Sequence, residues 1–555
     1  MPFSITKREL ARIDERIEAE RSLDALRALT QRLADDLRLA RDRLERTPSN
    51  SSMPSGSLAP WGGATSADES VAGQDEEQAS EGVQAPQDPE ASDPAGEPGD
   101  STKAAKAVAV KVSRHPGRQR GAKGHGRTQC LAVDHYEPHH PAQCECCGTV
   151  LQPSADAESI GGWDVIEWVP LHESSQQVQP AHPTIGALRL GMRLEVTRHL
   201  LMQQRCACGH VTAAQPHRVA NDEALWPKVR LGEQRLLGPQ LASVVVYLVM
   251  RLRCPRRKVQ ELLFVLFGLE LSVGLIEQTV LEAGRAAEAH DEALTRELLE
   301  AVVLHADETP WLEAGKVLWL WVFCSLATVL YVIGPRTAEM LASVLSPASF
   351  HGVLMSDGYA VYRAFVNRLR CWAHLARKIQ GQVDSNHQRV AQVGRLFQQH
   401  FDGLMQAIYA ARQAKAQQQS PAPYEEQVAA FKRLCEQYRD TSLPRVGELA
   451  REFLYDWDTI MRTLAEPHLP LTNNHGERTL RHHVQVRDIT YGTRCMTGTR
   501  AYAWLASVID TCRMRGASIL STLAATIAAA RKGMAPPPLP PIPDRLRGWG
   551  AVSAC

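Results

Sequence analysis

Two apolar runs that each end beside an aspartate constrain the fold of this chain more than any other feature. The run AVVLHADETP at 301–310 carries Asp307, and the run GVLMSDGYAVY at 352–362 carries Asp357. Runs of this length and composition are typical of strands that are buried on both faces. We predict that the two strands are neighbours in one sheet, that each aspartate lies at a strand end, and that Gly358 permits the turn after the second.

The uncharged stretch between these runs, residues 317–335, has nearly the length of about 20 residues that a membrane span requires. Its aromatic and β-branched residues, interrupted at 325–328, instead predict two antiparallel strands and a turn. A short helical pattern follows near 337–345. The predicted order is strand, strand, strand, helix, strand, which is typical of the ribonuclease-H-like fold.

In that fold a third carboxylate comes from a later helix, and Glu477 in LTNNHGERTLRHHVQVR is the best candidate. The alternative for Glu477 is an ion pair with Arg481 one helical turn on. Glu308, the next residue, competes with Asp307 as the first metal-binding carboxylate. Three carboxylates suit two Mg²⁺ or Mn²⁺ ions about 3.5 to 4 Å apart, which can stabilise the attacking and leaving oxygens of a phosphoryl transfer.

Charge is segregated along a chain whose formal net charge is zero. Residues 48–102 contain eleven Asp or Glu and no Lys or Arg, whereas residues 103–127 contain eight Lys or Arg and no acid. Residues 362–379 contain five Lys or Arg and no acid, and residues 475–515 contain seven Arg against three acids. We therefore expect positive charge around the carboxylates and a polyanion as partner. Trp372 in this region is expected in the core, and Cys371 with His374 has metal-like spacing without a second pair.

Cysteine pairs in CECCG and RCACGH, with strand-like residues between them, predict a tetrahedral zinc site. The proposed ligands are Cys144, Cys147, Cys206 and Cys208. His210 is a substitute ligand for the second pair, and Cys146 is an additional cysteine in the first motif. The alternative interpretation is that these are small buried cysteines without a metal.

These features predict a multidomain α+β protein. The predicted parts are a coiled-coil helix (1–47), a disordered acidic linker (48–104), a basic glycine-rich segment (105–128), a zinc-binding β module (129–220), a helical connector (221–300), a ribonuclease-H-like catalytic domain (301–535) with a helical insertion at about 380–465, and a proline-rich tail (536–555). A turn at 268–274 has a helix-turn-helix pattern. Ordinary helix packing produces this pattern more often, so no DNA recognition is assigned to it.

The motifs HADETP, SDGYAVY, CWAHLARK, NNHGERTLR and SVIDTCRMRG resemble those of the insertion sequence 66 (IS-66) family of DDE transposases. The resemblance implies binding of terminal inverted repeats, metal-dependent strand cleavage and transfer to target DNA. It also implies Asp307 as the carboxylate shared by both ions. This chain departs from the family pattern at two places. The first is the run Arg487, Asp488 and Ile489 after the glutamate helix, and the second is the shorter spacing of the second cysteine pair.

Eight basic residues are the candidate DNA contacts: Arg114, Arg118, Arg120, Lys123, Arg377, Lys378, Arg478 and Arg481. We expect a homo-oligomer in the cytoplasm, associated with the nucleoid when bound to DNA, with accessory proteins of the same element and no membrane contact. A start without a signal pattern and the many cysteines favour a reducing compartment. A nuclease that does not rejoin DNA and a catalytically silent zinc-containing DNA-binding regulator are the alternatives.

Overall fold

The computed structural model describes residues 23–44, 132–170, 192–217, 219–220, 222–417 and 423–547. The predicted acidic linker, the basic segment and its candidate DNA contacts lie outside these residues. Those contacts are Arg114, Arg118, Arg120 and Lys123. Of the predicted N-terminal helix, the described part is α3 (Leu23–Leu44).

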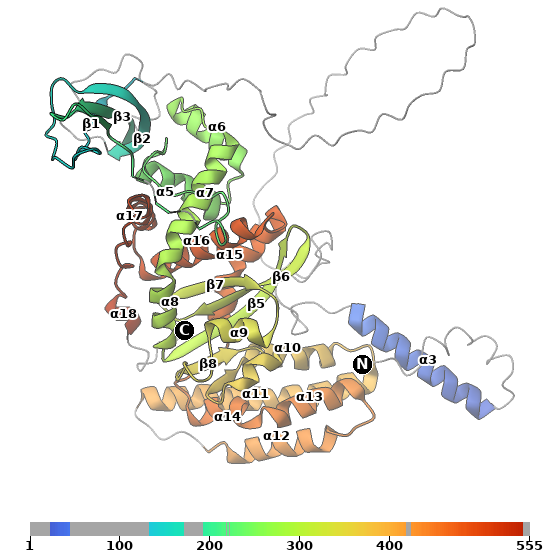
Figure 1. The fold of residues 1–555 in the computed structure, drawn as a ribbon. Helices are drawn as coiled ribbons and strands as arrows, with labels where there is room; N and C mark the ends of the chain where they lie inside the picture. The colour runs from blue at the N-terminus through green and yellow to red at the C-terminus, as the bar shows by residue number, and fades with distance from the viewer. Residues whose placement is uncertain are drawn as a thin grey trace, which may run out of the picture. The chain divides into compact units, whose positions relative to one another are not determined.

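A small β-sheet precedes the helical part of the chain (Figure 1). Its strand order is β1-β3-β2, and β4 pairs with β3. The pairing of β2 with β3 is antiparallel, and that of β1 with β3 is parallel. The strands are β1 (His135–His139), β2 (Glu158–Pro170), β3 (Met192–Arg205) and β4 (Val211–Ala213).

Helices follow, as the apolar periodicity predicts. At the turn between α6 and α7, Gly268 ends α6 in the left-handed conformation and Ser272 caps α7 by accepting a hydrogen bond from the Leu275 N–H. The helices are α5 (Pro239–Met250), α6 (Arg256–Phe267), α7 (Val273–Ala287), η2 (Glu288–His290) and α8 (Asp291–Leu299).

A second sheet of five strands has the order β7-β6-β5-β8-β9. β5 pairs with β8 and β8 with β9 in parallel, whereas β5, β6 and β7 form antiparallel neighbours. The predicted order of strand, strand, strand, helix, strand is present. Its elements are β5 (Val303–Glu313), β6 (Lys316–Cys324), β7 (Val329–Gly334), α9 (Ala338–Val344), β8 (Val353–Ser356) and β9 (Arg368–Arg370).

The prediction that Asp307 ends its strand is wrong. β5 continues to Glu313, and Asp307 lies opposite Val322 of the long partner strand β6. The hairpin with β6 keeps the strand extended beyond the aspartate. On the other side of β5, the pairing with β8 covers only residues 303–305, so Asp307 lies just beyond the point where this pairing stops.

Residues 317–335, whose length resembles that of a membrane span, form β6 and β7 as predicted. Within the described ranges, no helix is long and apolar enough to cross a membrane.

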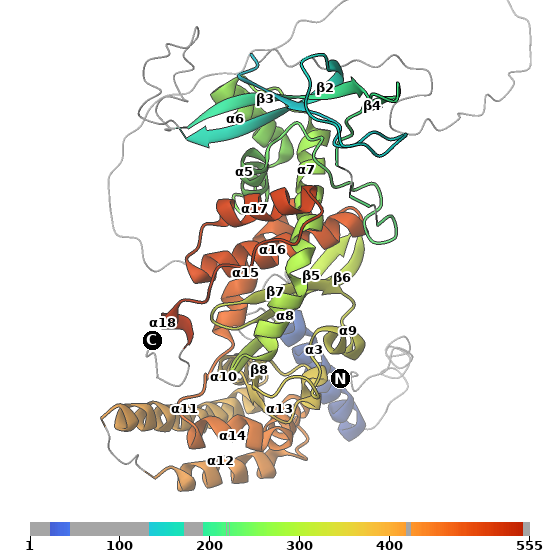
Figure 2. The same cartoon turned by 60° about the vertical axis from the view of Figure 1, so that its left-hand side comes forward.

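The segment between the second and third carboxylates is helical (Figures 1 and 2). Its helices enclose a core of their own that contains Phe397, Phe401, Phe431 and Phe453. Trp372 is fully buried against Phe401, so its predicted place in a core is confirmed. The elements are η3 (Ala360–Ala364), α10 (Trp372–Val383), α11 (Gln388–Ala416), α12 (Glu425–Tyr438), α13 (Pro444–Tyr455) and α14 (Trp457–Ala465).

The chain then returns to the five-stranded sheet through α15 (Asn474–Thr490) and α16 (Met496–Arg515). A tight turn joins these helices beside the end of β5. Gly492 has a φ of +82°, and a Cβ there would lie 2.0 Å from the Leu312 carbonyl oxygen, so only glycine fits. Helices α17 (Ile519–Arg531) and α18 (Asp544–Arg547) complete the described chain.

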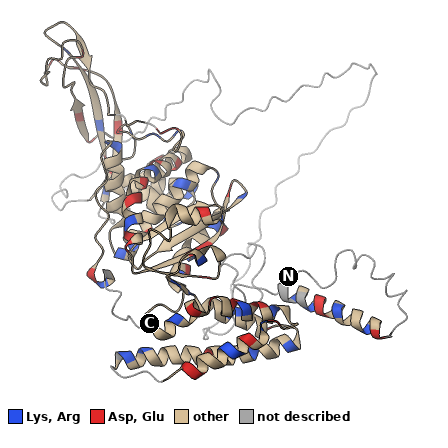
Figure 3. Cartoon of the chain, turned by 60° about the horizontal axis from the view of Figure 1, so that its bottom comes forward, with Lys and Arg blue, Asp and Glu red and all other residues tan. Residues whose placement is uncertain are grey.

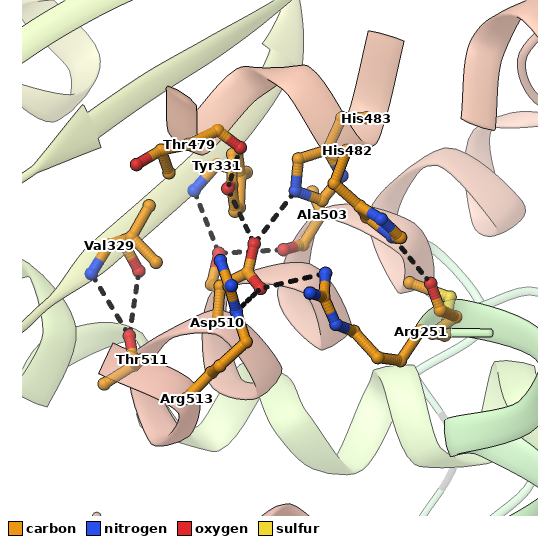
Figure 4. A network of polar contacts seen from close by, with 12 residues as sticks. Arg251, Val329, Tyr331, Thr479, His482, His483, Ala503, Asp510, Thr511 and Arg513 are labelled. Carbon is orange, nitrogen blue, oxygen red and sulfur yellow. Dashed lines mark hydrogen bonds and ion pairs between the residues drawn. The ribbon is translucent and has the colours of Figure 1, made fainter. Parts of the chain in front are cut away.

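A buried polar network around Asp510 of α16 fixes α15 and α16 to β7 (Figure 4). The Tyr331 hydroxyl donates to Asp510 Oδ2 at 2.8 Å, and His483 Nε2 lies 3.1 Å from the same oxygen. Arg513 Nε donates to Asp510 Oδ1 at 3.2 Å. Burial alone would raise the pKa of Asp510, but His483 and Arg513 hold it well below its usual value. The carboxylate is therefore charged and fully partnered.

We expect Asp510→Ala to lower the free energy of unfolding by about 3–5 kcal/mol, because it leaves His483 and the Tyr331 hydroxyl buried without their shared acceptor. Urea unfolding followed by circular dichroism measures this loss. The matched control is Asp440→Ala, which removes an exposed ion pair with Arg439 and should cost no more than about 1 kcal/mol. Equal losses in the two variants would contradict the structural role of the network.

Candidate metal-binding carboxylate site

The three predicted carboxylates come from three different elements. Asp307 lies within β5, Asp357 directly follows β8, and Glu477 lies in the first turn of α15. Burial raises the pKa of Asp307 well above its usual value, and the negative charges of Glu308, Asp357 and Glu477 raise it further. The fold therefore brings the predicted carboxylates close enough to repel one another.

The turn after β8 is stabilised by its own aspartate, since the Tyr359 N–H donates to Asp357 Oδ1 at 2.8 Å. The structure gives Gly358 a different role from the predicted turn. A Cβ at this position would lie 2.6 Å from Nη2 of Arg370, so the missing side chain makes room for a guanidinium.

Glu477 contacts α10, the helix that follows β9. Arg377 Nη2 donates to Glu477 Oε1 at 2.7 Å, and His374 Nδ1 lies 3.4 Å from the same oxygen. The expected alternative partner, Arg481, is exposed, and no ion pair between it and Glu477 is present among the described contacts. The ionic partner of Glu477 comes from a residue 100 positions earlier in the chain.

Asn473 is a site residue that the sequence reading missed. It is fully buried, donates from Nδ2 to the Ala306 carbonyl at 3.0 Å and accepts from His305 Nδ1 at 2.9 Å. Its backbone N–H donates to Cys371 Sγ at 3.1 Å. Asn473 therefore links β5, the start of α10 and the start of α15. The sequence signal for this role is the Asn-Asn pair before Glu477, but by itself the pair indicates only the start of a helix.

Glu308, the competing choice for Asp307, faces a different environment. Its carboxylate is buried, accepts from Arg336 Nη2 at 2.6 Å and from the Tyr362 hydroxyl at 2.6 Å. Burial raises the pKa of Glu308 to about 7. Arg336 in turn lies over the ring of Tyr359, 3.9 Å from its centroid. Because both oxygens of Glu308 already accept hydrogen bonds from protein groups, it is a poorer metal ligand than Asp307.

Cys371 and His374 gain a third neighbour in the fold, because their ligand atoms lie within 4.8 Å of a Glu477 oxygen. Burial raises the pKa of Cys371 to about 11, so its sulfur is a neutral thiol that accepts from the Asn473 N–H. Burial lowers the pKa of His374, which is therefore neutral. This trio is better suited to positioning Glu477 than to binding a metal through a thiolate.

The positive charge expected at residues 362–379 is paired within the protein. Every Lys and Arg in this segment has an acidic partner. The pairs are Arg363, Arg368 and Arg370 with Asp456, Arg370 and Lys378 with Glu452, and Arg377 with Glu477. The sequence could not show this, because the acids lie in or next to α13 and α15, far along the chain. Arg377 and Lys378 are thus ion-paired residues, whereas Arg478 and Arg481 are exposed on α15.

Arg487, at the first departure from the family pattern, is buried rather than exposed to a ligand. Its Nη1 donates to the Thr309 hydroxyl at 3.1 Å and to the Pro310 carbonyl at 3.0 Å. Asp488 forms an ion pair with it at 3.0 Å. The departure therefore attaches the end of α15 to β5, beyond the carboxylates.

Carboxylate oxygens are the donors that a hard divalent cation prefers. Asp307 lies near enough to Asp357 and Glu477 for their negative charges to raise its pKa, and a cation would neutralise these charges. Among the described residues, the three carboxylates do not form a group whose ligand atoms all lie within 4.8 Å of one another.

The four predicted cysteines of the small β-sheet also come together. Cys144 Sγ lies 3.7 Å from Cys208 Sγ, and Cys147 Sγ lies 3.6 Å from Cys206 Sγ. Tetrahedral zinc with bonds of about 2.3 Å requires sulfurs about 3.8 Å apart. Hydrogen bonds with Thr149 lower the pKa of Cys147 to about 6, whereas contacts with the other sulfurs raise the pKa of Cys208 to about 12. The substitute His210 and the spare Cys146 are not part of this group.

Comparison with known proteins identifies a family that part of the chain resembles. Residues 234–501 match the model of the family described as Transposase IS66 family, and all three carboxylates lie within the match. A protein of Sinorhizobium fredii (strain NBRC 101917 / NGR234), named Uncharacterized protein y4qI, is 24% identical over 309 residues. That alignment spans 49% of this chain and 56% of the relative. Over residues 234–501, somewhat less than half of its length, the chain is therefore similar to the IS66 family of transposases.

Proposed function

We propose that the chain binds the terminal inverted repeats of its own element and catalyses cleavage and transfer of DNA strands. The observation that carries this proposal is the match of residues 234–501 to the transposase family, within which the negative charges of Asp357 and Glu477 act on buried Asp307. We assign the five-stranded sheet to the ribonuclease-H-like fold. The strand order and the mixed parallel and antiparallel pairing support this assignment.

We assign Asp307, Asp357 and Glu477 as the ligands of two Mg²⁺ or Mn²⁺ ions. Such ions stabilise the charge on the attacking and leaving oxygens of an in-line phosphoryl transfer. The protein orients the ligands through Asn473, which holds α15 against β5, and through Arg377 and His374, which contact the Glu477 carboxylate. Glu308 acts beside this site by anchoring Arg336 and Tyr362.

We assign zinc to Cys144, Cys147, Cys206 and Cys208, where it would join the loops after β1 and β3. Arg478 and Arg481 are assigned to DNA contact because they are exposed and lie next to Glu477. The proposal also includes assembly as a homo-oligomer, action with accessory proteins of the element, and location in the cytoplasm on nucleoid DNA.

The first test uses Asp307→Asn with labelled DNA that carries the element's ends, target DNA and Mg²⁺. We expect cleavage to fall at least about 1,000-fold, because the site loses a charged ligand, while binding of the ends changes less than about twofold. Gel electrophoresis resolves bound, cut and joined DNA in one experiment. Joined product from the unaltered protein separates a transposase from a nuclease that only cuts.

The matched control for this test is Glu308→Gln, which changes the adjacent carboxyl group of the same strand. We expect it to retain cleavage within about tenfold, since Glu308 contacts Arg336 and Tyr362 rather than the ions. Loss of cleavage in Glu308→Gln together with normal cleavage in Asp307→Asn would overturn the ligand assignment. Absence of cleavage in the unaltered, DNA-binding protein would support a silent regulator.

A second test concerns the two exposed arginines of α15. We expect the double variant Arg478→Ala and Arg481→Ala to reduce the slope of log affinity against log salt by about 1 to 2, because two phosphate contacts are lost. Fluorescence anisotropy with end DNA at several salt concentrations measures the slope. Arg439→Ala, which removes a similarly exposed arginine at the end of α12, should leave the slope unchanged. An unchanged slope in the double variant would remove these residues from the DNA contacts.

A third test concerns zinc. We expect Cys147→Ser to lower the zinc content of the purified full chain by one equivalent, because three remaining sulfurs bind zinc far more weakly. Elemental analysis gives the zinc-to-protein ratio. The neighbouring Cys146→Ser is the control and should keep the ratio of the unaltered chain, since Cys146 lies outside the group. Identical zinc ratios in the two variants would contradict the assignment.

A further inference from the structure

A second cluster of ligand atoms lies on the small β-sheet, apart from the four cysteines. Its members are Glu137 and His139 of β1 and His199 of β3. Residues two apart on a strand point to the same face, so Glu137 and His139 share one face of β1. The parallel register places Glu137 opposite His199. Adjacent strands therefore present a carboxylate and two imidazoles to one point.

The ligand atoms of this cluster lie close to one another. His199 Nδ1 lies 2.9 Å from His139 Nε2 and 3.2 Å from Glu137 Oε2. An imidazole nitrogen carries either one proton or one lone pair. A protonated His199 Nδ1 has to share one proton between the His139 Nε2 lone pair and the carboxylate, whereas a cation between the three atoms would contact each of them directly.

The indole of Trp163 holds both imidazoles in place. Trp163 pairs with His199 in the register of β2 and β3, and their rings stack with centroids 4.7 Å apart and planes 10° apart. The His139 ring stacks on the same indole at 5.3 Å with an angle of 18°. Rings that are already fixed in place are suited to metal binding, because little order has to be imposed on them.

We propose that Glu137, His139 and His199 bind a zinc ion at a site separate from the cysteine cluster. Two imidazoles and a carboxylate are a usual donor set for this metal, and three protein ligands leave a fourth position for water. Tetrahedral zinc with Zn–N bonds of about 2.0–2.1 Å places two nitrogens about 3.3 Å apart. The observed 2.9 Å between the imidazole nitrogens is within a few tenths of an ångström of this value.

The zinc ion would strengthen the attachment of the edge strand β1 to the sheet. β1 has five residues, includes Pro138 without an N–H, and is bonded to the sheet through β3. A bond from Glu137 and His139 through the metal to His199 adds a link between these two strands. Because β1 leads into the loop that carries Cys144 and Cys147, the second ion would also restrain the first zinc site.

The test titrates the metal-free full chain with Co²⁺ and with Zn²⁺ and measures bound metal and the cobalt absorption spectrum. The titration is done in excess Mg²⁺, which keeps Co²⁺ and Zn²⁺ from the carboxylate site, and we then expect two equivalents in the unaltered chain. His199→Gln should bind one equivalent and keep the cobalt–thiolate absorption of the cysteines, which reports in the same sample that the module is folded. Cys147→Ser should lose the thiolate absorption and retain the second equivalent.

Two further variants complete the test. His135→Gln, on the same strand but outside the cluster, is the control and should bind two equivalents. Glu137→Gln changes a side chain that is 58% exposed, so it preserves the fold and should weaken the second equivalent at least tenfold. One equivalent in the unaltered chain, or two in both His199→Gln and Glu137→Gln, would overturn the proposal and leave a hydrogen-bonded cluster. The outcome does not depend on DNA cleavage.

Discussion

The hydrogen bonds of Asn473 connect the chain segments on which the candidate carboxylates depend. One side chain bonds to two consecutive residues of β5, His305 and Ala306, while its backbone bonds to Cys371 at the start of α10. All of these groups are buried, so breaking any one of them would leave a polar atom without a partner. This small network fixes where α15 begins and therefore where Glu477 lies relative to Asp307.

Assembling the carboxylate site costs electrostatic free energy. Bringing Asp307 towards Asp357 and Glu477 in a buried setting opposes ionisation, as the raised pKa of Asp307 shows. Packing of the five-stranded sheet and the Asp510 network supply stability close by, because α15 and α16 are fixed to β7 by a fully partnered carboxylate. The fold thus contains one buried acid, Asp510, that neighbouring groups keep charged, and another, Asp307, whose ionisation the neighbouring acids oppose.

Local sequence pattern was sufficient for the strands, for the position of Asp357 and for the helix that carries Glu477. It failed where partners are distant in the sequence. The continuation of β5 beyond Asp307 depends on pairing with β6, and the charge of 362–379 depends on Glu452 and Asp456. The cluster of Glu137, His139 and His199 was missed because 60 residues separate the two histidines and neither stands in a recognisable motif.

Ion pairs connect the helical insertion to the sheet domain, although the insertion has a core of its own. Its acids Glu452 and Asp456 bind Arg370, which is fully buried and passes beside Gly358 next to the second carboxylate. Without these acids the buried guanidinium would lack its counter-charges, a state that costs several kcal/mol. Figure 3 shows Lys and Arg interspersed with Asp and Glu over the described helices, in keeping with internal pairing. The insertion therefore supplies the counter-charges of the guanidinium beside the turn at Asp357, whereas Arg478 and Arg481 of α15 are exposed.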